Sequence, residues 1–334
     1  MGALETVTFG VIAYNEHNYL PDLLSDLLSQ TYPKKLIEVI LVDGNSNDDT
    51  LDIMRSFQES HNDLYKDIKI YQNPKKIQPS GWNIVLQNMH CDVVLRIDAH
   101  ARLPKDFVER NMFRINAGEN VCGGPRENII DEDTAWKQML LDAEQSMFGS
   151  GIASYRKQTS DIKYVKSVFH GAYRKDVIEN VGRFNENLVR TEDNEYHYRI
   201  IKAGYKICYD PCIKSLYQTR SSLKSMIRQK YLNGKWIGIT LFVCPHCISL
   251  FHLIPAAFVL AMTFCSIIAA IGCKFFLVAL LSLYILFLIA STLISCCKSK
   301  NYMDVFLPAV IFSIHIAYGL GTIIGLFKRI ERKD

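Results

Sequence analysis

Three long stretches without Asp, Glu, Lys or Arg restrict the possible folds of this chain more than any other feature. They cover residues 248–273, 275–297 and 305–327 of a 334-residue chain. Each is long enough to cross the hydrocarbon core of a bilayer, for which about 20 apolar residues suffice. Three such stretches in succession favour membrane helices over buried core helices. We therefore predict a transmembrane region over residues 241–334.

The preceding residues have the balanced composition of a soluble domain. Residues 1–240 contain 31 Lys/Arg and 31 Asp/Glu. The apolar run Thr6–Ala13 is too short for a secretory signal and lacks a basic flank, so we expect this part to stay in the cytoplasm. Between Lys202 and Lys235 there are eight Lys/Arg and one acid. Basic residues next to a membrane segment mark its cytoplasmic side and attract anionic lipid, so we expect a membrane partner and no nucleic acid.

The basic residues after the third apolar stretch conflict with this orientation. If the soluble domain is inside, three crossings place Lys328, Arg329, Arg332 and Lys333 outside, against the positive-inside tendency. Either one apolar stretch is re-entrant, or residues 248–297 do not cross the membrane twice. The sequence leaves both alternatives open.

Short β-rich runs alternate with helical patterns over the first 125 residues. The predicted strands are Thr6–Ala13, Ile37–Val42, Ile68–Tyr71, Val93–Ile97 and Val121–Gly123. The predicted helices are His17–Gln30, Thr50–Ser60, Ser80–Met89 and Lys105–Ala117. This alternation predicts an α/β fold with βαβ units and a mostly parallel sheet. In such sheets ligands bind beyond the carboxyl ends of the strands.

The pattern is less regular over residues 126–165. Val168–Tyr173 and Tyr205–Tyr209 are predicted as strands, and Tyr196–Ala203 as a helix that ends before Gly204. The amphipathic pattern of Ser222–Trp236 predicts a helix in the membrane interface. We thus expect a catalytic domain over 1–218, an interface helix over 219–240 and the transmembrane region after it.

Clusters of polar side chains suited to binding or catalysis follow the predicted strands. Ala13-Tyr14-Asn15-Glu16 ends the first strand, and Asp43-Gly44-Asn45-Ser46-Asn47-Asp48-Asp49-Thr50 ends the second. Asp98 and His100 follow another strand, where residues i and i+2 point to one side and can share a divalent metal ion. A fourth cluster is Thr191-Glu192-Asp193-Asn194-Glu195. The chain contains no Gly-x-Gly-x-x-Gly or Walker loop, which disfavours dinucleotide binding and ATP hydrolysis.

In this order, the four clusters resemble the inverting family 2 glycosyltransferases over about residues 5–215. Within that family, Arg96-Ile97-Asp98-Ala99-His100 with Pro104, the segment Phe169-His170-Gly171-Ala172 and the C-terminal apolar stretches look like the succinoglycan-biosynthesis glucosyltransferase branch. The resemblance implies a glycosyltransferase A type nucleotide-sugar-binding domain.

The resemblance also implies roles for individual residues. Asp193 would be the base that deprotonates the acceptor, with Glu192 beside it, and His170 and Gly171 would line the donor and acceptor pocket. Asp98 would bind Mg²⁺ or Mn²⁺ at the donor diphosphate, with His100 as a neighbouring ligand. The implied donor-binding residues are Ala13, Asn15, Glu16, Asp43, Asn73, Arg96 and Asp98.

These residue types suit the chemistry. A departing nucleoside diphosphate develops negative charge that a hard divalent cation neutralises. An inverting displacement needs a carboxylate within hydrogen-bond reach of the attacking hydroxyl. The chain departs from the family where an acid commonly stands in place of His100. Because Mg²⁺ prefers oxygen ligands, the identity of the metal stays open, and His100 could contact phosphate directly.

We therefore expect transfer of one sugar from a nucleotide sugar to a lipid-linked acceptor at the cytoplasmic membrane face, in cell-surface polysaccharide or glycan assembly. Processive synthases carry Gln/Arg-x-x-Arg-Trp before their membrane helices, whereas this chain has Asn233-Gly234-Lys235-Trp236, which favours single transfer. The alternatives are an enzyme that acts on polyprenyl phosphate itself and an inactive membrane scaffold or nucleotide-sugar sensor.

Overall fold

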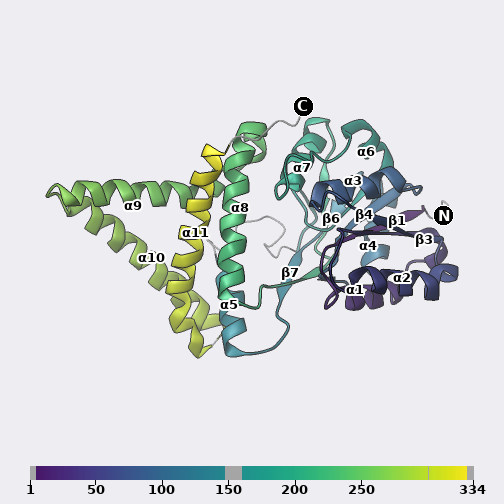
Figure 1. Ribbon diagram of the computed structural model, residues 1–334, viewed down its shortest axis with the longest axis horizontal. Coiled ribbons are helices and arrows are strands. Elements are labelled where there is room, and N and C mark those ends of the chain that lie inside the picture. The colour runs from purple at the N-terminus through teal and green to yellow at the C-terminus, as the bar shows by residue number, and fades with distance from the viewer. Residues whose placement is uncertain (1–4, 147–159, 300, 329–334) are drawn as a thin grey trace. The chain divides into compact units, whose positions relative to one another are not determined.

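The structure is a computed structural model that describes residues 5–146, 160–299 and 301–328. The chain divides into two compact units (Figure 1). The first contains residues 1–127 and 153–217, and the second contains residues 128–152 and 218–334. One division falls between Tyr217 and Gln218, close to the predicted end of the catalytic domain at residue 218, and residues 128–152 group with the second unit.

The first unit is built on a sheet whose described strands run in the order β3-β2-β1-β4-β9-β6-β10-β8. These strands are β1 (Val7–Ala13), β2 (Ile37–Asp43), β3 (Asp67–Gln72), β4 (Val93–Asp98), β6 (Val121–Gly123), β8 (Lys163–Val165), β9 (Gly171–Arg174) and β10 (Ile207–Tyr209). Strands β1 to β4 are parallel to one another, as are β6 and β10, while β8 and β9 are antiparallel to their neighbours. The predicted α/β fold with a mostly parallel sheet is confirmed.

The register brings the ends of four strands to one edge. Ala13 of β1 pairs with Asp43 of β2, Ile12 pairs with Asp98 of β4, and Asp43 pairs with Gln72 of β3. The chain adds β2 and β3 on one side of β1 and then returns to add β4 on the other side. This reversal creates a crevice between β1 and β4, which is where ligands bind in open α/β sheets.

Helices cover both faces of this sheet, with α1, α2 and α4 on one face and α3, α6 and α7 on the other (Figure 1). Their bounds are α1 (Leu20–Leu28), α2 (Thr50–His61), α3 (Gln78–Asn88), α4 (Phe107–Asn116), α6 (Lys175–Val181) and α7 (Glu192–Lys202). Helix α7 begins at Glu192, four residues before the predicted start, so the acidic cluster forms its first turn. It ends as predicted, before Gly204, whose φ of +92° closes the helix.

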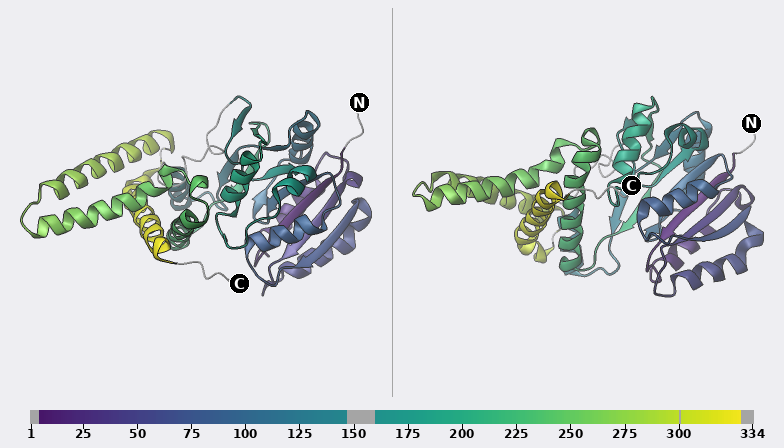
Figure 2. Two further views of the ribbon diagram at one scale, coloured as in Figure 1. Left: turned by 90° about the horizontal axis from the view of Figure 1, so that it is seen from above. Right: turned by 45° about the horizontal axis from the view of Figure 1, so that its top comes forward.

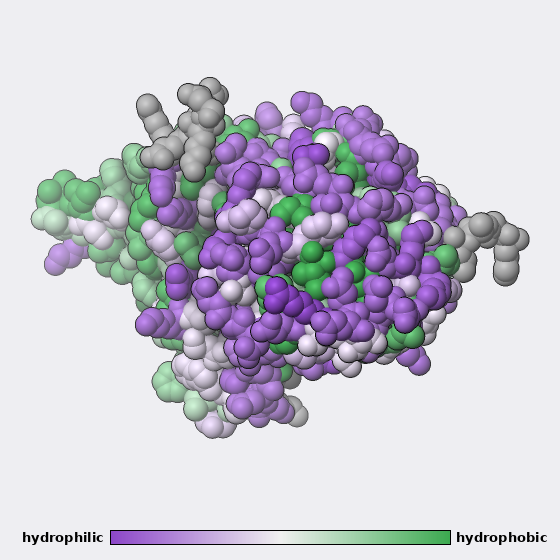
Figure 3. Space-filling model, turned by 45° about the vertical axis from the view of Figure 1, so that its right-hand side comes forward, coloured by the Kyte–Doolittle hydropathy of each residue, from purple (hydrophilic) through white to green (hydrophobic). Residues whose placement is uncertain are grey.

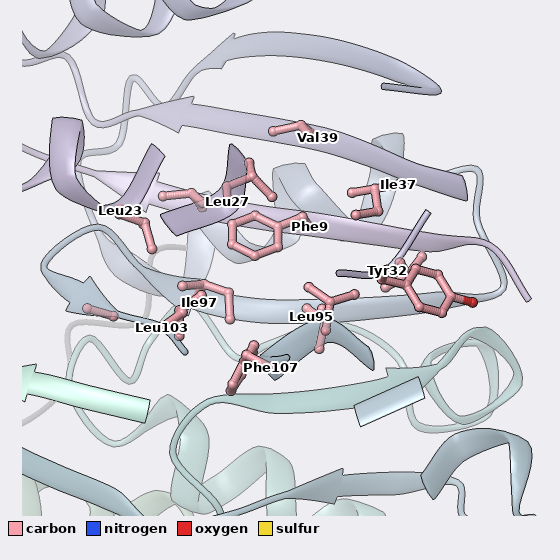
Figure 4. Packing of buried hydrophobic residues seen from close by; sticks show 14 of the residues in the cluster. Phe9, Leu23, Leu27, Tyr32, Ile37, Val39, Leu95, Ile97, Leu103 and Phe107 are labelled. Carbon is pink, nitrogen blue, oxygen red and sulfur yellow. The ribbon is translucent and has the colours of Figure 1, made fainter. Parts of the chain in front are cut away.

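Alternation along the strands fixes which side chains enter each core layer. Phe9 of β1 and Leu95 of β4 pack with Leu27 of α1 and Phe107 of α4 (Figure 4). Arg96 lies between Leu95 and Ile97 in the sequence and therefore points to the opposite face of β4. Burying a Leu or Phe side chain contributes about 1.5–3 kcal/mol, so this layer holds the strand ends in place.

Strand β5 (Ala101–Arg102) pairs antiparallel with β11 (Ser215–Gln218), and β7 covers Arg126–Ile129. The pairing places Tyr217 opposite Ala101, one residue after His100.

The second unit is helical. It contains α5 (Ala135–Gln145), α8 (Leu223–Val243), α9 (Ile254–Ala270), α10 (Phe275–Ser299) and α11 (Leu307–Phe327). Residues 250–270, 275–297 and 302–327 are long and apolar enough to cross a membrane, at the places predicted from the sequence. Helix α5 lies in a region predicted to be irregular, and it joins this unit because Met139, Leu140 and Ala143 pack with side chains of α8, α10 and α11.

Candidate functional site

A pocket lies at the carboxyl ends of β1, β2 and β4, where the order of the strands reverses. Its lining includes Ala13, Glu16, Gly44, Asn73, Asp98 and His100. Side chains and backbone more than 80 residues apart in the sequence are thus brought together by the parallel register. Five of these six residues belong to the predicted site. The other one, Gly44, directly follows the predicted site residue Asp43.

The loops after β1 and β2 are tied to each other by hydrogen bonds. Asn15 has a left-handed backbone (φ +56°), and its side-chain oxygen accepts from the backbone N–H of Asn47 at 2.9 Å. The N–H of Asn15 donates to Ser46 Oγ at 2.9 Å, and the N–H of Glu16 donates to Thr50 Oγ1 at 2.8 Å. The polar residues of the second loop therefore shape the backbone of the pocket, and the side chain of Asn15 is used within it.

Asp43 and Asn73 form a buried hydrogen-bonded wall. Asp43 is 1% exposed and accepts from the N–H of Ser46 at 3.2 Å, while its backbone oxygen accepts from the N–H of Asn73 at 2.7 Å. The Asn73 side chain donates to the Ile77 oxygen and accepts from Ser80 Oγ. Buried polar groups need such partners, and here the hydrogen bonds fix the positions of Asp43 and Asn73.

Asp98 and His170 meet beside the pocket. The backbone N–H of Asp98 lies 3.4 Å from His170 Nε2, and Asp98 Oδ2 lies 3.8 Å from the same nitrogen. Burial raises the pKa of Asp98, but the hydrogen bond with His170 and the charges of His170, His100 and Arg96 lower it well below its usual value. Asp98 is therefore held as a carboxylate. His170 lies directly before β9, where Gly171 pairs with Gly123 of β6.

His100 is engaged by Glu16. Its Nδ1 lies 3.1 Å from Glu16 Oε1, while its Nε2 is buried and has no hydrogen-bond partner among the described residues. Burial lowers the pKa of His100, but the hydrogen bond with Glu16 and the charges of Glu16 and Asp98 raise it to about 9. Since Nδ1 is occupied by Glu16, Nε2 is the nitrogen that remains for a ligand, as a hydrogen-bond donor to phosphate when the ring is protonated or as a metal ligand when it is neutral.

Arg96 lies inside the unit and does not line the pocket. Its guanidinium Nη2 lies 2.9 Å from Glu192 Oε1, and both side chains are buried. The same guanidinium stacks on the rings of Trp82 and Phe184, with 5.1 and 5.5 Å to the ring centroids. The residue was expected to bind the donor. Its side chain instead binds Glu192, the first acid of α7. Arg96 and Asp98 are two residues apart and therefore point to the same face of β4.

The first turn of α7 carries two interacting carboxylates. Burial and the neighbouring Asp193 raise the pKa of Glu192, and burial raises the pKa of Asp193, while the Arg96 charge lowers both. The N–H of Asn194 donates to Asp193 Oδ1 at 2.8 Å. Glu195, in the same turn, instead pairs with Arg199 at 2.7 Å. Only Glu192 and Asp193 therefore share the electrostatic environment of Arg96 and Asp98.

Sequence reasoning missed an aromatic stack beside His100. Arg126 lies 4.3 Å from the Phe169 ring centroid and 4.1 Å from that of Tyr217, and Tyr217 meets the His100 ring edge-on at 4.9 Å. No local pattern links positions 126, 169 and 217. Lys76, by contrast, follows β3 at the same sheet edge as the predicted site and lines the pocket, so its position could have been recognised.

Asp98 is the residue that fits a divalent metal ion at this site. The described residues contain no group of three His, Cys, Asp or Glu side chains that could form a metal site. Mg²⁺ at a phosphorylated substrate is commonly held by one or two carboxylates together with the phosphates. The ionised carboxylate of Asp98, beside the pocket, provides a ligand of that kind.

The chain is similar to known glycosyltransferases in sequence and in fold. Residues 8–182 match the family described as Glycosyl transferase family 2. The dolichyl N-acetyl-alpha-D-glucosaminyl phosphate 3-beta-D-2,3-diacetamido-2,3-dideoxy-beta-D-glucuronosyltransferase of Methanococcus voltae is 28% identical over 321 residues, which cover 94% of this chain and 95% of that protein. The succinoglycan biosynthesis protein ExoA of Rhizobium meliloti (strain 1021) is 26% identical over 228 residues, 66% of each chain.

Among solved structures, the mannosyltransferase PcManGT from Pyrobaculum calidifontis, in complex with GDP-Man and Mn²⁺, aligns with a TM-score of 0.62 and 16% identity. The alignment covers 95% of this chain and 87% of that one. GalNAc-T7 with UDP, GalNAc and Mn²⁺ aligns with a TM-score of 0.52 and 17% identity, over 70% of this chain and 51% of that one. These likenesses establish a shared fold.

Proposed function

Because the chain belongs to glycosyl transferase family 2, we propose that it transfers one sugar, with inversion, from a nucleotide sugar to a lipid-linked acceptor at the cytoplasmic face of a membrane. The product would enter cell-surface polysaccharide or glycan assembly. The observation that supports this most is the joint placement of an ionised Asp98 and the acidic first turn of α7 around one buried cation, Arg96.

The pocket at the sheet edge would hold the donor. Ala13, Glu16 and Asn73 line it together with Asp98 and His100, and the hydrogen-bonded loops keep it preformed. His100 would donate from Nε2 to the diphosphate, since Nδ1 is occupied by Glu16. The resulting charge-assisted hydrogen bond orients the leaving group.

Asp98 would hold a bound Mg²⁺ or Mn²⁺, which would neutralise the charge that develops on the departing nucleoside diphosphate. Asp193 would accept the proton of the acceptor hydroxyl as the new glycosidic bond forms. Its raised pKa makes it a stronger base than an exposed aspartate, and the Arg96 charge limits that rise. Glu192 accepts a hydrogen bond from Arg96 and so positions it.

The acceptor class follows from two observations. The Methanococcus voltae relative, similar along 94% of this chain, is named for an acceptor that is a sugar phosphate on dolichol. The second unit carries helices apolar enough to lie in a membrane, where a polyprenyl acceptor is confined. We therefore favour a polyprenyl-linked sugar over free polyprenyl phosphate.

The test presents full-length protein in lipid nanodiscs with two acceptors, polyprenyl phosphate and polyprenyl-phosphate N-acetylglucosamine. UDP- and GDP-sugars are screened as donors, with Mn²⁺ or Mg²⁺. We expect a product that is one sugar longer, formed on the glycosylated acceptor only. Transfer to bare polyprenyl phosphate alone would contradict the proposed acceptor. Donor binding without transfer to either would favour the inactive scaffold.

The charge of Arg96 predicts a pH effect. Asp193 must be ionised to act as a base, and its pKa lies above the ordinary aspartate value of about 3.9. Activity should therefore rise with pH through that raised pKa. Because the Arg96 charge lowers the pKa of Asp193, Arg96→Gln should move this acid limb to higher pH.

Two further variants keep this prediction testable if Arg96→Gln folds poorly. In Arg96→Gln/Glu192→Gln the buried pair is neutral, and the acid limb should still move upward. Arg199→Gln removes a cation from the same helix that pairs with Glu195, and it should leave the limb in place. An unchanged pH–kcat/KM profile in the double variant would contradict Asp193 as the titrating base.

A further inference from the structure

Helices α8 and α11 run parallel and in backbone contact. A side chain at Gly321 or Gly325 of α11 would collide with the backbone oxygens of Tyr231 and Lys235 of α8. A side chain at Gly234 of α8 would collide in turn with the Tyr318 oxygen. Later residues of one helix face later residues of the other, so the two helices point the same way. Such contacts along most of their length give them one common orientation.

Helix α8 is not a membrane-crossing helix by composition. It carries four basic side chains between its second and thirteenth residues, namely Lys224, Arg228, Lys230 and Lys235. Lys224 and Arg228 are exposed. Lys230 is buried and pairs with Glu144 of α5 at 2.7 Å. Charged side chains at the centre of a bilayer are costly and rare, and those at the interface are not.

The contacts between α8 and α11 place these charges level with the middle of α11. Tyr231 lies beside Gly321 and Lys235 beside Gly325. If α11 crossed the bilayer, Arg228 and the Lys230–Glu144 pair would therefore be drawn into the hydrocarbon with it. The orientation that keeps the charges of α8 hydrated also keeps α11 in the membrane interface.

Helices α9 and α10 behave differently. The two helices extend away from α8 and α11 and form a hairpin (Figures 1 and 2). The turn that joins them, residues 271–274, is the tip of this hairpin. Only 17% and 11% of their apolar windows is buried, compared with 50% for α11. The part of the hairpin that is visible in Figure 3 is mostly hydrophobic. Exposed side chains along the hairpin include Leu260, Phe264, Ile267, Leu283 and Leu286.

We propose that α9 and α10 are the two crossing helices, that hydrocarbon covers their outer surface, and that α8 and α11 lie together in the membrane interface. At 1.5 Å per residue, the 17 residues of α9 span about 26 Å, and the 3₁₀ turn Leu250–Leu253 before it extends the apolar segment toward the roughly 30 Å of a hydrocarbon core. The 25 residues of α10 suffice with a tilt.

Two crossings resolve the conflict in the charge pattern. With α11 in the interface, Lys328, Arg329, Arg332 and Lys333 lie on the same side of the membrane as the basic cluster between Lys202 and Lys235. The positive-inside tendency is then satisfied at both ends of the membrane region. The third apolar stretch, predicted to cross from its length and composition, becomes part of the interface layer.

Reporter fusions to the full chain test this topology. Green fluorescent protein and alkaline phosphatase, which are active on opposite sides of a bacterial inner membrane, are placed at the N-terminus, at Gly272, before Asn301 and after Asp334. We expect the tip on one side and the other three positions together on the opposite side. A reporter after Asp334 on the side opposite to Asn301 would overturn the proposal, because α11 would then cross. A tip on the same side as the N-terminus would also overturn it and would leave a second protein copy as the cover of the hairpin.

A matched pair of charge substitutions gives a second readout that does not depend on fusions. Leu286 of α10 and Leu320 of α11 are both exposed, at 64% and 43%. Leu286→Arg should reduce the yield of membrane-inserted, folded protein by about tenfold or more, since it places a charge at mid-bilayer. Leu320→Arg should reduce it by less than about threefold, because an interfacial arginine reaches water. Equal losses, or the reverse order, would contradict the proposal.

Discussion

Replacing Asp193 by asparagine is expected to lower kcat for sugar transfer by about 10²–10⁴-fold, the usual contribution of a positioned general base. Asparagine has nearly the same shape but cannot accept the proton of the attacking hydroxyl. The donor pocket is formed by the ends of β1, β2 and β4 and not by α7. Donor affinity, measured by calorimetry with Mn²⁺ present, should therefore stay within about threefold of the wild type, while single-turnover transfer is lost.

The neighbouring acids of α7 provide matched controls. Glu195→Gln retains an oxygen for the contact with Arg199 and should keep near-normal activity. Glu192→Gln weakens the pairing with Arg96 and should lower activity less than Asp193→Asn does. If Glu192→Gln abolishes transfer while Asp193→Asn retains more than a tenth of kcat, Glu192 is the base.

The sheet and the strand-end clusters were predictable because their signals are local. Strands buried on both faces are continuous apolar runs, and each is followed directly by its polar loop. Since parallel strands end at one edge, Ala13, Asp43 and Asp98 could be placed together without knowledge of any contact. The acidic cluster at residues 191–195 was also recognised, but the start of the helix that contains it was placed four residues too late.

Contacts between distant segments were not predictable. Whether Arg96 faces the donor or the interior depends on Trp82, Phe184 and Glu192, which come from three other segments of the chain. The Glu16–His100 pair likewise joins residues 84 positions apart. Composition gave the apolar stretches correctly, but it could not reveal that glycines hold α11 against a charged helix.

Asp98→Asn is the second variant with a large expected effect, because Asp98 lines the pocket and, unlike the pocket residue Glu16, is not paired with His100. Loss of its charge removes the ligand proposed for the divalent ion, whose charge stabilisation is worth several kcal/mol. We expect kcat/KM to fall by about 10²–10³-fold, since each factor of ten corresponds to about 1.36 kcal/mol. Addition of Mn²⁺ should tighten donor binding to the wild type and leave the variant unaffected.

Stability separates this effect from misfolding. The carboxylate of Asp98 is 7% exposed, so its desolvation costs free energy that only nearby positive charge offsets. Asparagine can still accept a hydrogen bond, so the variant should fold. Because the pKa of Asp98 lies well below its usual value, its neighbours stabilise the ionised form, and the midpoint of thermal unfolding of Asp98→Asn should lie somewhat below that of the wild type at neutral pH. A variant that is as stable as the wild type, yet shows the same Mn²⁺-dependent donor binding, would exclude Asp98 as the metal ligand.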